Sequence, residues 1–176
     1  MSEPASRRLF FALWPEGEVR DALRAWQKGC LSGNVRPTHR DDLHLTVHFL
    51  GQVDAGRIDR LLALADQVHV PRFDLVLDRL GHFARPRVLW AGPATVPAEL
   101  RNLHADLASG LRDCGFEPES RPYRPHVTLA RKVRERPEVA DLPAIHWTVG
   151  HWALVESRPG RVPLYAPLNV WEADAN

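Results

Sequence analysis

A short pattern of residues occurs twice in this chain and constrains its fold more than any other feature. Residues 44–47 are His-Leu-Thr-Val, and residues 126–129 are His-Val-Thr-Leu. Each tetrad lies in an apolar stretch with β-branched residues, which predicts a buried strand. Side chains two residues apart in a strand point to the same face, so the histidine and the threonine of each tetrad should share a face. If the two strands lie side by side, two imidazoles and two hydroxyls converge on one site.

The rest of the chain predicts an α+β fold in which the tetrads belong to two similar parts. Apolar periodicity predicts strands at 8–14, 43–50, 73–83, 88–91, 124–130, 145–156 and 164–171, and helices at 16–31, 54–68 and 97–113. Residues 34–42 are predicted to be a polar connector, and residues 84–87 a hairpin turn. Each tetrad follows a helix and a polar connector. We therefore predict a degenerate duplication: two α+β lobes, related by a pseudo-twofold axis, within a single domain over residues 1–176.

Composition and charge exclude several classes of protein. The 176 residues are 44% hydrophobic and 26% charged, and the net charge of +1 is too small for the positive field that holds long duplex nucleic acid. Cys30 and Cys114 are too few and too far apart to indicate a zinc site or a disulfide framework. The first eight residues lack a hydrophobic signal core, and no apolar run approaches the roughly 20 residues that span a bilayer. We expect a cytoplasmic protein with no membrane partner.

The side chains of the two tetrads, His44, Thr46, His126 and Thr128, suit acid–base chemistry at a phosphate. Histidine titrates near pH 6.5, so a pair holds one neutral and one protonated imidazole near neutrality. The neutral ring takes a proton from a nucleophile and the protonated ring gives one to a leaving oxygen, each transfer contributing about 10²–10⁴ in rate. Threonine hydroxyls donate to the non-bridging oxygens. Because the tetrads are equivalent, their spacing does not say which histidine is the acid.

Two further polar residues lie close to the tetrads in the sequence. Arg131 follows Thr128 by three residues, so strict alternation puts it on the opposite face. It reaches the phosphate only if the strand bends or ends near residue 130, and otherwise it is a solvated cation at a strand end. His48 shares the face of His44 by alternation, and we expect it in the core or behind the site. A zinc site is not expected, because histidines four residues apart bind zinc from a helix.

Aromatic residues near the predicted site are candidates for stacking on a nucleobase. They are Phe11, Trp14, Phe83 and Tyr123. Each of these has the alternative role of a core or turn residue.

Longer stretches around the tetrads resemble the two-histidine phosphoesterase superfamily. Within it, the chain is similar to the bacterial and archaeal RNA 2',3'-cyclic phosphodiesterases, historically called 2'-5' RNA ligases. The stretches that carry the resemblance are Arg-Leu-Phe-Phe-Ala-Leu-Trp-Pro at 8–15, Arg-Pro at 36–37, Leu-His-Leu-Thr-Val-His-Phe-Leu-Gly at 43–51, Arg-Val-Leu-Trp-Ala-Gly at 87–92, Arg-Pro-His-Val-Thr-Leu-Ala-Arg at 124–131 and Leu-Tyr-Ala-Pro-Leu-Asn-Val-Trp at 164–171. They cover nearly the whole chain, in order.

The resemblance implies a bilobal α+β fold with a central cleft between two antiparallel sheets and helices outside. It also implies hydrolysis of a 2',3'-cyclic phosphate at an RNA end to a 2'-phosphate, without a metal or other cofactor. In that reaction His44 is the proton donor to the leaving 3' oxygen and His126 is the proton acceptor. Thr46, Thr128 and Arg131 bind the phosphate. The reverse reaction, which needs no ATP, joins such an end to a 5'-hydroxyl in a 2'-5' linkage.

Two other functions remain open from the sequence. The same four side chains serve a two-histidine phosphodiesterase of another substrate, such as a small cyclic nucleotide, ADP-ribose 1'',2''-cyclic phosphate or a 3'-oligouridine tail. A non-catalytic protein that binds RNA ends is the second alternative, although such a protein has less reason to retain all four residues. The expected partner is RNA with 2',3'-cyclic phosphate ends, for example tRNA fragments, and the expected oligomeric state is a monomer.

Overall fold

The structure is a computed structural model that describes residue 2 and residues 5–175. Within these residues, three α-helices interrupt a chain that consists mostly of strands, and the last four elements are all strands. The elements are β1 (Ser6–Leu13), α1 (Gly17–Cys30), β2 (Arg36–Pro37), β3 (Leu45–Asp54), α2 (Ile58–Asp66), β4 (Phe73–Leu77), β5 (Arg79–Phe83), β6 (Val88–Gly92), α3 (Ala98–Asp113), β7 (Val127–Arg131), β8 (Ile145–Val149), β9 (His151–Ser157) and β10 (Tyr165–Glu172). None of the described helices is long and apolar enough to cross a membrane.

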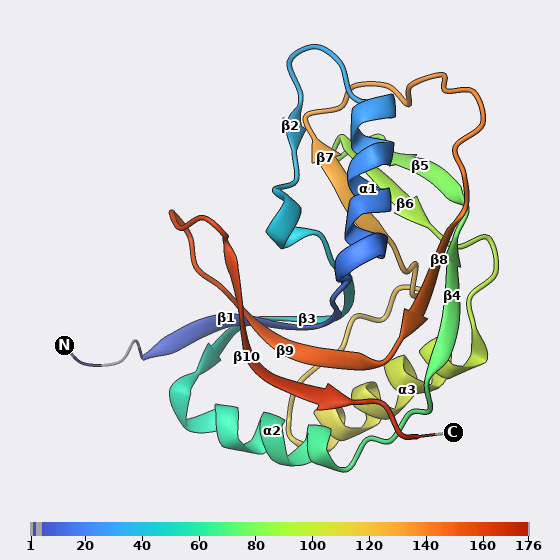
Figure 1. Cartoon of the computed structure of the whole chain (residues 1–176). Helices are drawn as coiled ribbons and strands as arrows, with labels where there is room; N and C mark the ends of the chain where they lie inside the picture. Colours follow the sequence, from blue (N-terminus) through green and yellow to red (C-terminus); the bar gives the residue numbers. More distant parts are fainter. Residues whose placement is uncertain (1, 3–4, 176) are drawn as a thin grey trace.

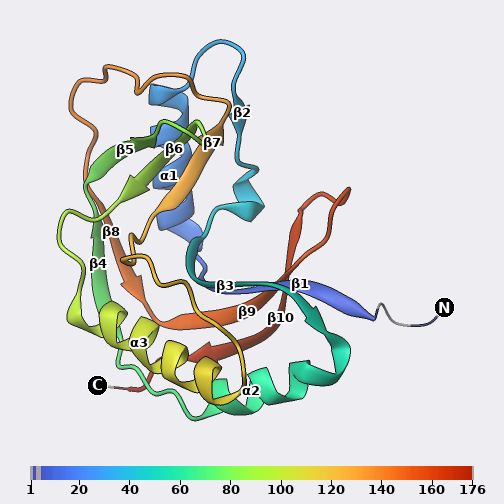
Figure 2. The same ribbon diagram turned by 180° about the vertical axis from the view of Figure 1, so that it is seen from behind.

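The strands form one large and one small antiparallel sheet. The large sheet has the order β10-β9-β1-β3-β7-β6-β5, with β2 paired to β7, and the small sheet pairs β4 with β8. Between β3 and β7, the register contains a single pair, Leu45 opposite Val127. The two groups of strands therefore diverge from this contact, which Figures 1 and 2 show from opposite sides. These features confirm the predicted α+β fold with antiparallel sheets.

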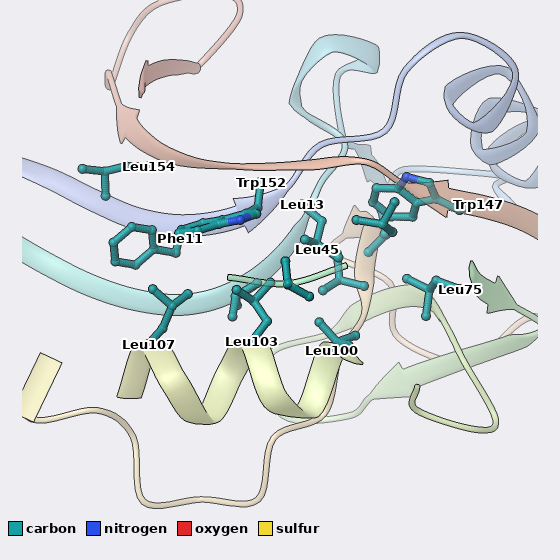
Figure 3. Packing of buried hydrophobic residues seen from close by; sticks show 14 of the residues in the cluster. Phe11, Leu13, Leu45, Leu75, Leu100, Leu103, Leu107, Trp147, Trp152 and Leu154 are labelled. Atoms are coloured by element: carbon teal, nitrogen blue, oxygen red, sulfur yellow. The ribbon is translucent and has the colours of Figure 1, made fainter. Parts of the chain in front are cut away.

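The helices lie against different parts of the strand framework. Helix α3 contacts β3 and α2, whereas α1 contacts β7 and β8. In α3, Leu100, Leu103, Leu107 and Leu111 recur every three or four residues and are almost completely buried. Figure 3 shows the first three of these leucines against side chains of β1 and β3. Burying each leucine contributes about 1.5–3 kcal/mol, and this packing fixes the strand on which the first tetrad lies.

Two predicted strands are each divided into two shorter strands. The predicted strand at 73–83 is β4 and β5, which belong to different sheets. Asp78 separates them, and its carboxylate accepts a hydrogen bond from the backbone N–H of Ala94 at 2.7 Å. The predicted strand at 145–156 is β8 and β9, which Gly150 separates. The alternation of apolar residues continues through both junctions. The sequence pattern therefore did not reveal that the chain passes from one sheet to the other at Asp78 and Gly150.

The predicted connectors and helix ends also differ from the structure in detail. Residues 34–42 contain the short strand β2 and a 3-10 turn, Arg40–Asp42. The helix predicted from Asp54 begins with a second 3-10 turn, Ala55–Arg57, and α2 ends at Asp66. Helical periodicity therefore predicted the helix, but one 3-10 turn replaced its first α-helical turn.

Candidate active site

The two tetrads meet where β3 and β7 touch, as their pattern predicts. Leu45 and Val127 are opposite each other and completely buried on the core side of the sheet. The residues on either side of this pair, His44 and Thr46 on one strand and His126 and Thr128 on the other, are all partly exposed. Alternation along the strands therefore places all four on the other face of the sheet. Each histidine immediately precedes its strand rather than lying within it.

Both imidazoles are held through the same ring nitrogen by the same kind of contact. Nδ1 of His44 lies 2.7 Å from the carbonyl oxygen of Asp42, and Nδ1 of His126 lies 2.7 Å from that of Arg124. A carbonyl oxygen only accepts, so each Nδ1 must donate its proton, and in the neutral ring Nε2 carries the lone pair. Nε2 of His44 lies 3.0 Å from Oγ1 of Thr46 and accepts from that hydroxyl. The backbone thus fixes the orientation of both rings and leaves the lone pair of each neutral ring on Nε2.

Burial controls the charge of both rings. It lowers the pKa of His44 to about 4, and the positive charges of His126 and Arg131 act in the same direction. The hydrogen bond to Asp42 and the charge of the Asp42 carboxylate partly offset this effect. Burial also lowers the pKa of His126, again with a contribution from Arg131. Both imidazoles are therefore neutral at pH 7 in the free protein, and both can accept a proton at Nε2.

Arg131 lies on the same face as Thr128, because a β-bulge interrupts the alternation of β7. Thr128 pairs with Trp90 and Ala130 pairs with Leu89, so Leu129 is an extra residue. Trp90 and Leu89 point to opposite faces of their strand, and Ala130 therefore faces away from Thr128. The next residue, Arg131, returns to the Thr128 face, where its charge acts on both histidines. Strict alternation was wrong for Arg131.

A second bulge has the opposite consequence for His48. Thr46 pairs with Ala12 and His48 pairs with Phe11, which leaves Val47 as the extra residue in β3. His48 therefore points away from Thr46, into the core, where its Nε2 donates to the carbonyl oxygen of His104 at 2.7 Å. The prediction that His48 shares the face of His44 was wrong, and the core position was correct.

Aromatic rings enclose each histidine. The Trp14 indole lies parallel to the His44 ring at a centroid distance of 5.1 Å, and the rings of Phe10 and Tyr165 lie 4.9 and 5.0 Å away. Beside His126, the ring of Phe83 lies 5.1 Å away and that of Trp90 lies 6.0 Å away. These rings desolvate the imidazoles and limit their rotation.

Two of the four aromatic candidates from the sequence thus lie at the site and two do not. Trp14 and Phe83 contact the histidines. Phe11 is buried in the core next to Trp152. Tyr123 stacks on His104 and donates its hydroxyl proton to the carbonyl oxygen of Thr46 at 2.8 Å, so it supports β3 from behind.

Asp42 lies beside the site and contacts His44, and the sequence did not reveal it. Its side chain is only 6% exposed, and its two carboxylate oxygens accept hydrogen bonds from the backbone N–H groups of Leu164 and Tyr165, both at 3.1 Å. The same residue holds His44 through its carbonyl oxygen. Asp42 therefore connects the start of β10, and the Tyr165 ring, to the first histidine. The partners are more than 120 residues apart in the chain, so no local pattern predicts the contact.

The described residues contain no group of three or more His, Cys, Asp or Glu side chains arranged to hold a metal ion. On the face that carries the tetrads, the tetrads and Arg131 contribute two imidazoles, two hydroxyls and one guanidinium. Such a set binds an anion through hydrogen bonds and positive charge, and moves protons through the imidazoles.

Comparison with known proteins places the chain in a family. The family model of the 2'-5' RNA ligase superfamily matches residues 15–161. The RNA 2',3'-cyclic phosphodiesterase of Escherichia coli is 35% identical over 97% of this chain and 98% of the relative. The RNA 2',3'-cyclic phosphodiesterase of Thermus thermophilus is 33% identical over 92% of this chain and 87% of the relative.

A solved structure has the same fold over almost the full length. The crystal structure of E. coli LigT complexed with 3'-AMP superposes with a TM-score of 0.82 and 33% identity, covering 96% of this chain and 98% of the other. The sequence and structure alignments both cover nearly the whole chain, and this chain belongs to the 2'-5' RNA ligase superfamily.

Proposed function

We propose that this protein is an RNA 2',3'-cyclic phosphodiesterase that opens the cyclic phosphate to a 2'-phosphate by acid–base catalysis with His44 and His126. The observation that carries the proposal is the paired anchoring of the two imidazoles. Each Nδ1 donates to a carbonyl oxygen, which leaves each Nε2 to exchange protons on the face that carries Thr46 and Thr128. The activity of the E. coli relative supports the same reaction.

In the proposed reaction His126 is the base and His44 is the acid. Nε2 of His126 takes a proton from water, and the water oxygen forms a bond to phosphorus. The bond from phosphorus to the 3' oxygen breaks, and Nε2 of His44 gives that oxygen its proton. This assignment follows the resemblance to the two-histidine family, because the two rings are anchored alike through Nδ1.

The acid must carry a proton when substrate is bound, although burial keeps His44 neutral in the free protein. The cyclic phosphate is an anion, and a nearby negative charge stabilises the imidazolium and raises the pKa of His44. Binding of the substrate therefore favours the protonated form of His44. Arg131 and the hydroxyls of Thr46 and Thr128 bind the non-bridging oxygens, where negative charge lies in the transition state.

We propose that the site arose from a duplicated, two-lobed arrangement within one domain over residues 1–176. The anchoring of each histidine by the carbonyl oxygen two residues earlier is the same in both parts, as are the tetrads themselves. The proposed pseudo-twofold axis would pass through the Leu45–Val127 pair, because this pair joins the two tetrad strands. The monomeric state, the cytoplasmic location and tRNA fragments as natural substrates stay predictions from the sequence. ATP-independent 2'-5' ligation is expected as the reverse reaction.

The decisive assay incubates the purified protein, with EDTA present, with a short RNA that ends in a 2',3'-cyclic phosphate. The chemistry of the product end is then mapped. A 2'-phosphate supports the proposal, and a 3'-phosphate would reverse the identity of the leaving oxygen. Turnover of only a small cyclic nucleotide or ADP-ribose 1'',2''-cyclic phosphate would favour that alternative class. RNA binding without turnover of any of these would favour a protein that binds RNA ends.

A further inference from the structure

A basic pocket lies in the large sheet, away from the catalytic histidines. It has a volume of about 510 Å³, and its lining includes Arg7, Arg8, Arg158 and Arg161 together with Gln52 and Ser157. The lining contains one acidic residue, Glu156, which pairs with Arg7 at 3.9 Å. The lining thus includes four arginines and one carboxylate, an excess of positive charge in a protein whose net charge is only +1.

Two residues of the pocket lining, Arg8 and Gln52, lie on the face of the sheet that carries the catalytic residues. In β1, Ala12 pairs with Thr46, Phe10 with Phe49 and Arg8 with Gln52, and these three rows share one face because β1 alternates regularly. Four residues of extended strand separate Ala12 from Arg8, or about 13 Å. The positive charge of Arg8 also reaches the site, since it partly offsets the rise in the pKa of Tyr165 that burial causes.

An exposed aromatic ring lies between the active site and the pocket. Phe49 is 48% exposed, which is unusual for a phenylalanine in a central strand, and it belongs to the middle of the three rows. The guanidinium of Arg8 lies over the Phe49 ring, 5.0 Å from its centroid. An aromatic ring next to a groove of arginines is the arrangement by which proteins hold single-stranded nucleic acid, because bases stack on the ring and phosphates bind the cations.

One guanidinium in the pocket has a hydrogen-bond donor without a partner. Within the described part of the chain, Nε of Arg158 is buried without a hydrogen-bond partner, while its Nη2 donates to the carbonyl oxygen of Pro163 at 3.4 Å. Arg161 is exposed in the turn that joins β9 to β10. Arginine binds phosphate through two parallel N–H donors, so these side chains suit a phosphate better than a neutral ligand.

We propose that the basic pocket and Phe49 form a second binding site for the RNA strand that ends in the cyclic phosphate. A base of a nucleotide upstream of the reacting end stacks on Phe49, and a phosphate still further upstream binds Arg8, Arg158 and Arg161. This site makes the enzyme prefer oligonucleotides to cyclic mononucleotides. The inference rests on the proposed function for its substrate, and the site makes no contact with the reacting atoms.

The test compares a substrate that is too short to reach the pocket with one that is long enough to reach it. They are 2',3'-cyclic AMP and a hexanucleotide with a 2',3'-cyclic phosphate end. Arg161→Ala and Phe49→Ala should each raise KM for the hexanucleotide about tenfold, because a stacked base or a bound phosphate is lost. Neither substitution should change kcat/KM for 2',3'-cyclic AMP. Arg161→Ala should also lower the slope of log KM against log salt by about 0.7, the contribution of one phosphate contact on a single strand.

The control variant is Arg60→Ala, which removes an exposed arginine from α2 and should leave both substrates unaffected. Equal effects of Arg161→Ala on both substrates, or no effect on either, would overturn the inference. A change in the binding of inorganic phosphate without a change for the hexanucleotide would also overturn it, because the pocket would then hold a free ion.

Failure of the proposed function gives a different result. In that case the wild-type protein turns over neither substrate. Fluorescence anisotropy with the labelled hexanucleotide then tests the pocket alone: weaker binding by Arg161→Ala and Phe49→Ala supports it, and unchanged binding overturns it.

Discussion

Leu45 of β3 lies directly opposite Val127 of β7, and both side chains are completely buried. The two histidines come immediately before these residues and the two threonines immediately after them. One contact between strands thus places all four polar side chains, because the buried pair occupies the core side and alternation turns its neighbours to the other side. The residues that form the core at this point also set the positions of the two histidines relative to each other.

Replacing either histidine should abolish catalysis and leave the fold intact. We expect His44→Ala and His126→Ala each to lower kcat by about 10²–10⁴, the usual contribution of one proton transfer. Thr46→Ala and Thr128→Ala should cost less, because each removes one of several phosphate contacts. Steady-state kinetics measures the loss, and circular dichroism confirms the fold. Full activity in the double histidine variant would contradict the site.

The roles of acid and base should separate when the leaving group no longer needs a proton. In a nitrophenyl phosphodiester, the nitrophenolate leaves without receiving a proton from a general acid. With this substrate His44→Ala should recover most of its activity, whereas His126→Ala should remain inactive. If only His126→Ala recovered activity with this substrate, His126 would be the acid and His44 the base.

The His44 ring should titrate far below the ordinary pKa of histidine. Burial disfavours the imidazolium and lowers the pKa to about 4 in the free protein, and NMR of the ring carbon and nitrogen resonances measures it. Addition of inorganic phosphate should raise this pKa. Because the unfolded chain binds the proton more tightly, His44 contributes stability above about pH 6.5, and this contribution is lost as the pH falls toward 4. A pKa near 6.5 without ligand would show that the ring is not desolvated.

Arg131 should act on the substrate and on both histidines. Its positive charge lowers the pKa of each imidazole, so Arg131→Ala should raise both values while it raises KM. In Arg131→Lys, the two pKa values should return close to those of the wild type, because lysine replaces the charge. KM should stay raised, because lysine lacks the two parallel donors. Titration by NMR, together with kinetics, distinguishes the two effects. Arg85→Ala, in the exposed β5–β6 turn, is the matched control.

Asp42 should be needed for both stability and activity. Asp42→Ala leaves the backbone N–H groups of Leu164 and Tyr165 without their acceptor. We expect a loss of about 1–3 kcal/mol in the free energy of unfolding for the partners left unpaired. Activity should fall as well, since Tyr165 is no longer held against His44. Denaturant titration of this variant beside Asp41→Ala, which alters an exposed neighbour, checks the prediction. Equal stabilities would contradict it.

The tetrads were predictable from the sequence because alternation in a strand is a local rule. The same rule failed for Arg131 and His48, since each lies just beyond a β-bulge. A bulge depends on how a strand pairs with its neighbour, and the sequence of one strand does not contain that information. Phe10, Trp90, Tyr165 and Asp42 were missed for a related reason, because they reach the histidines only through pairing of distant strands.

The placement of the helices affects how this protein can be divided. Helix α1 precedes the first tetrad in the chain but lies against β7 and β8, whereas α3 comes from the middle of the chain and lies against β3. Each part of the sheet therefore depends on a helix encoded with the other tetrad. A gene truncated between the tetrads would express His44 with α1, the helix that supports the absent strand β7. Each half of the chain therefore carries the helix that supports the histidine of the other half.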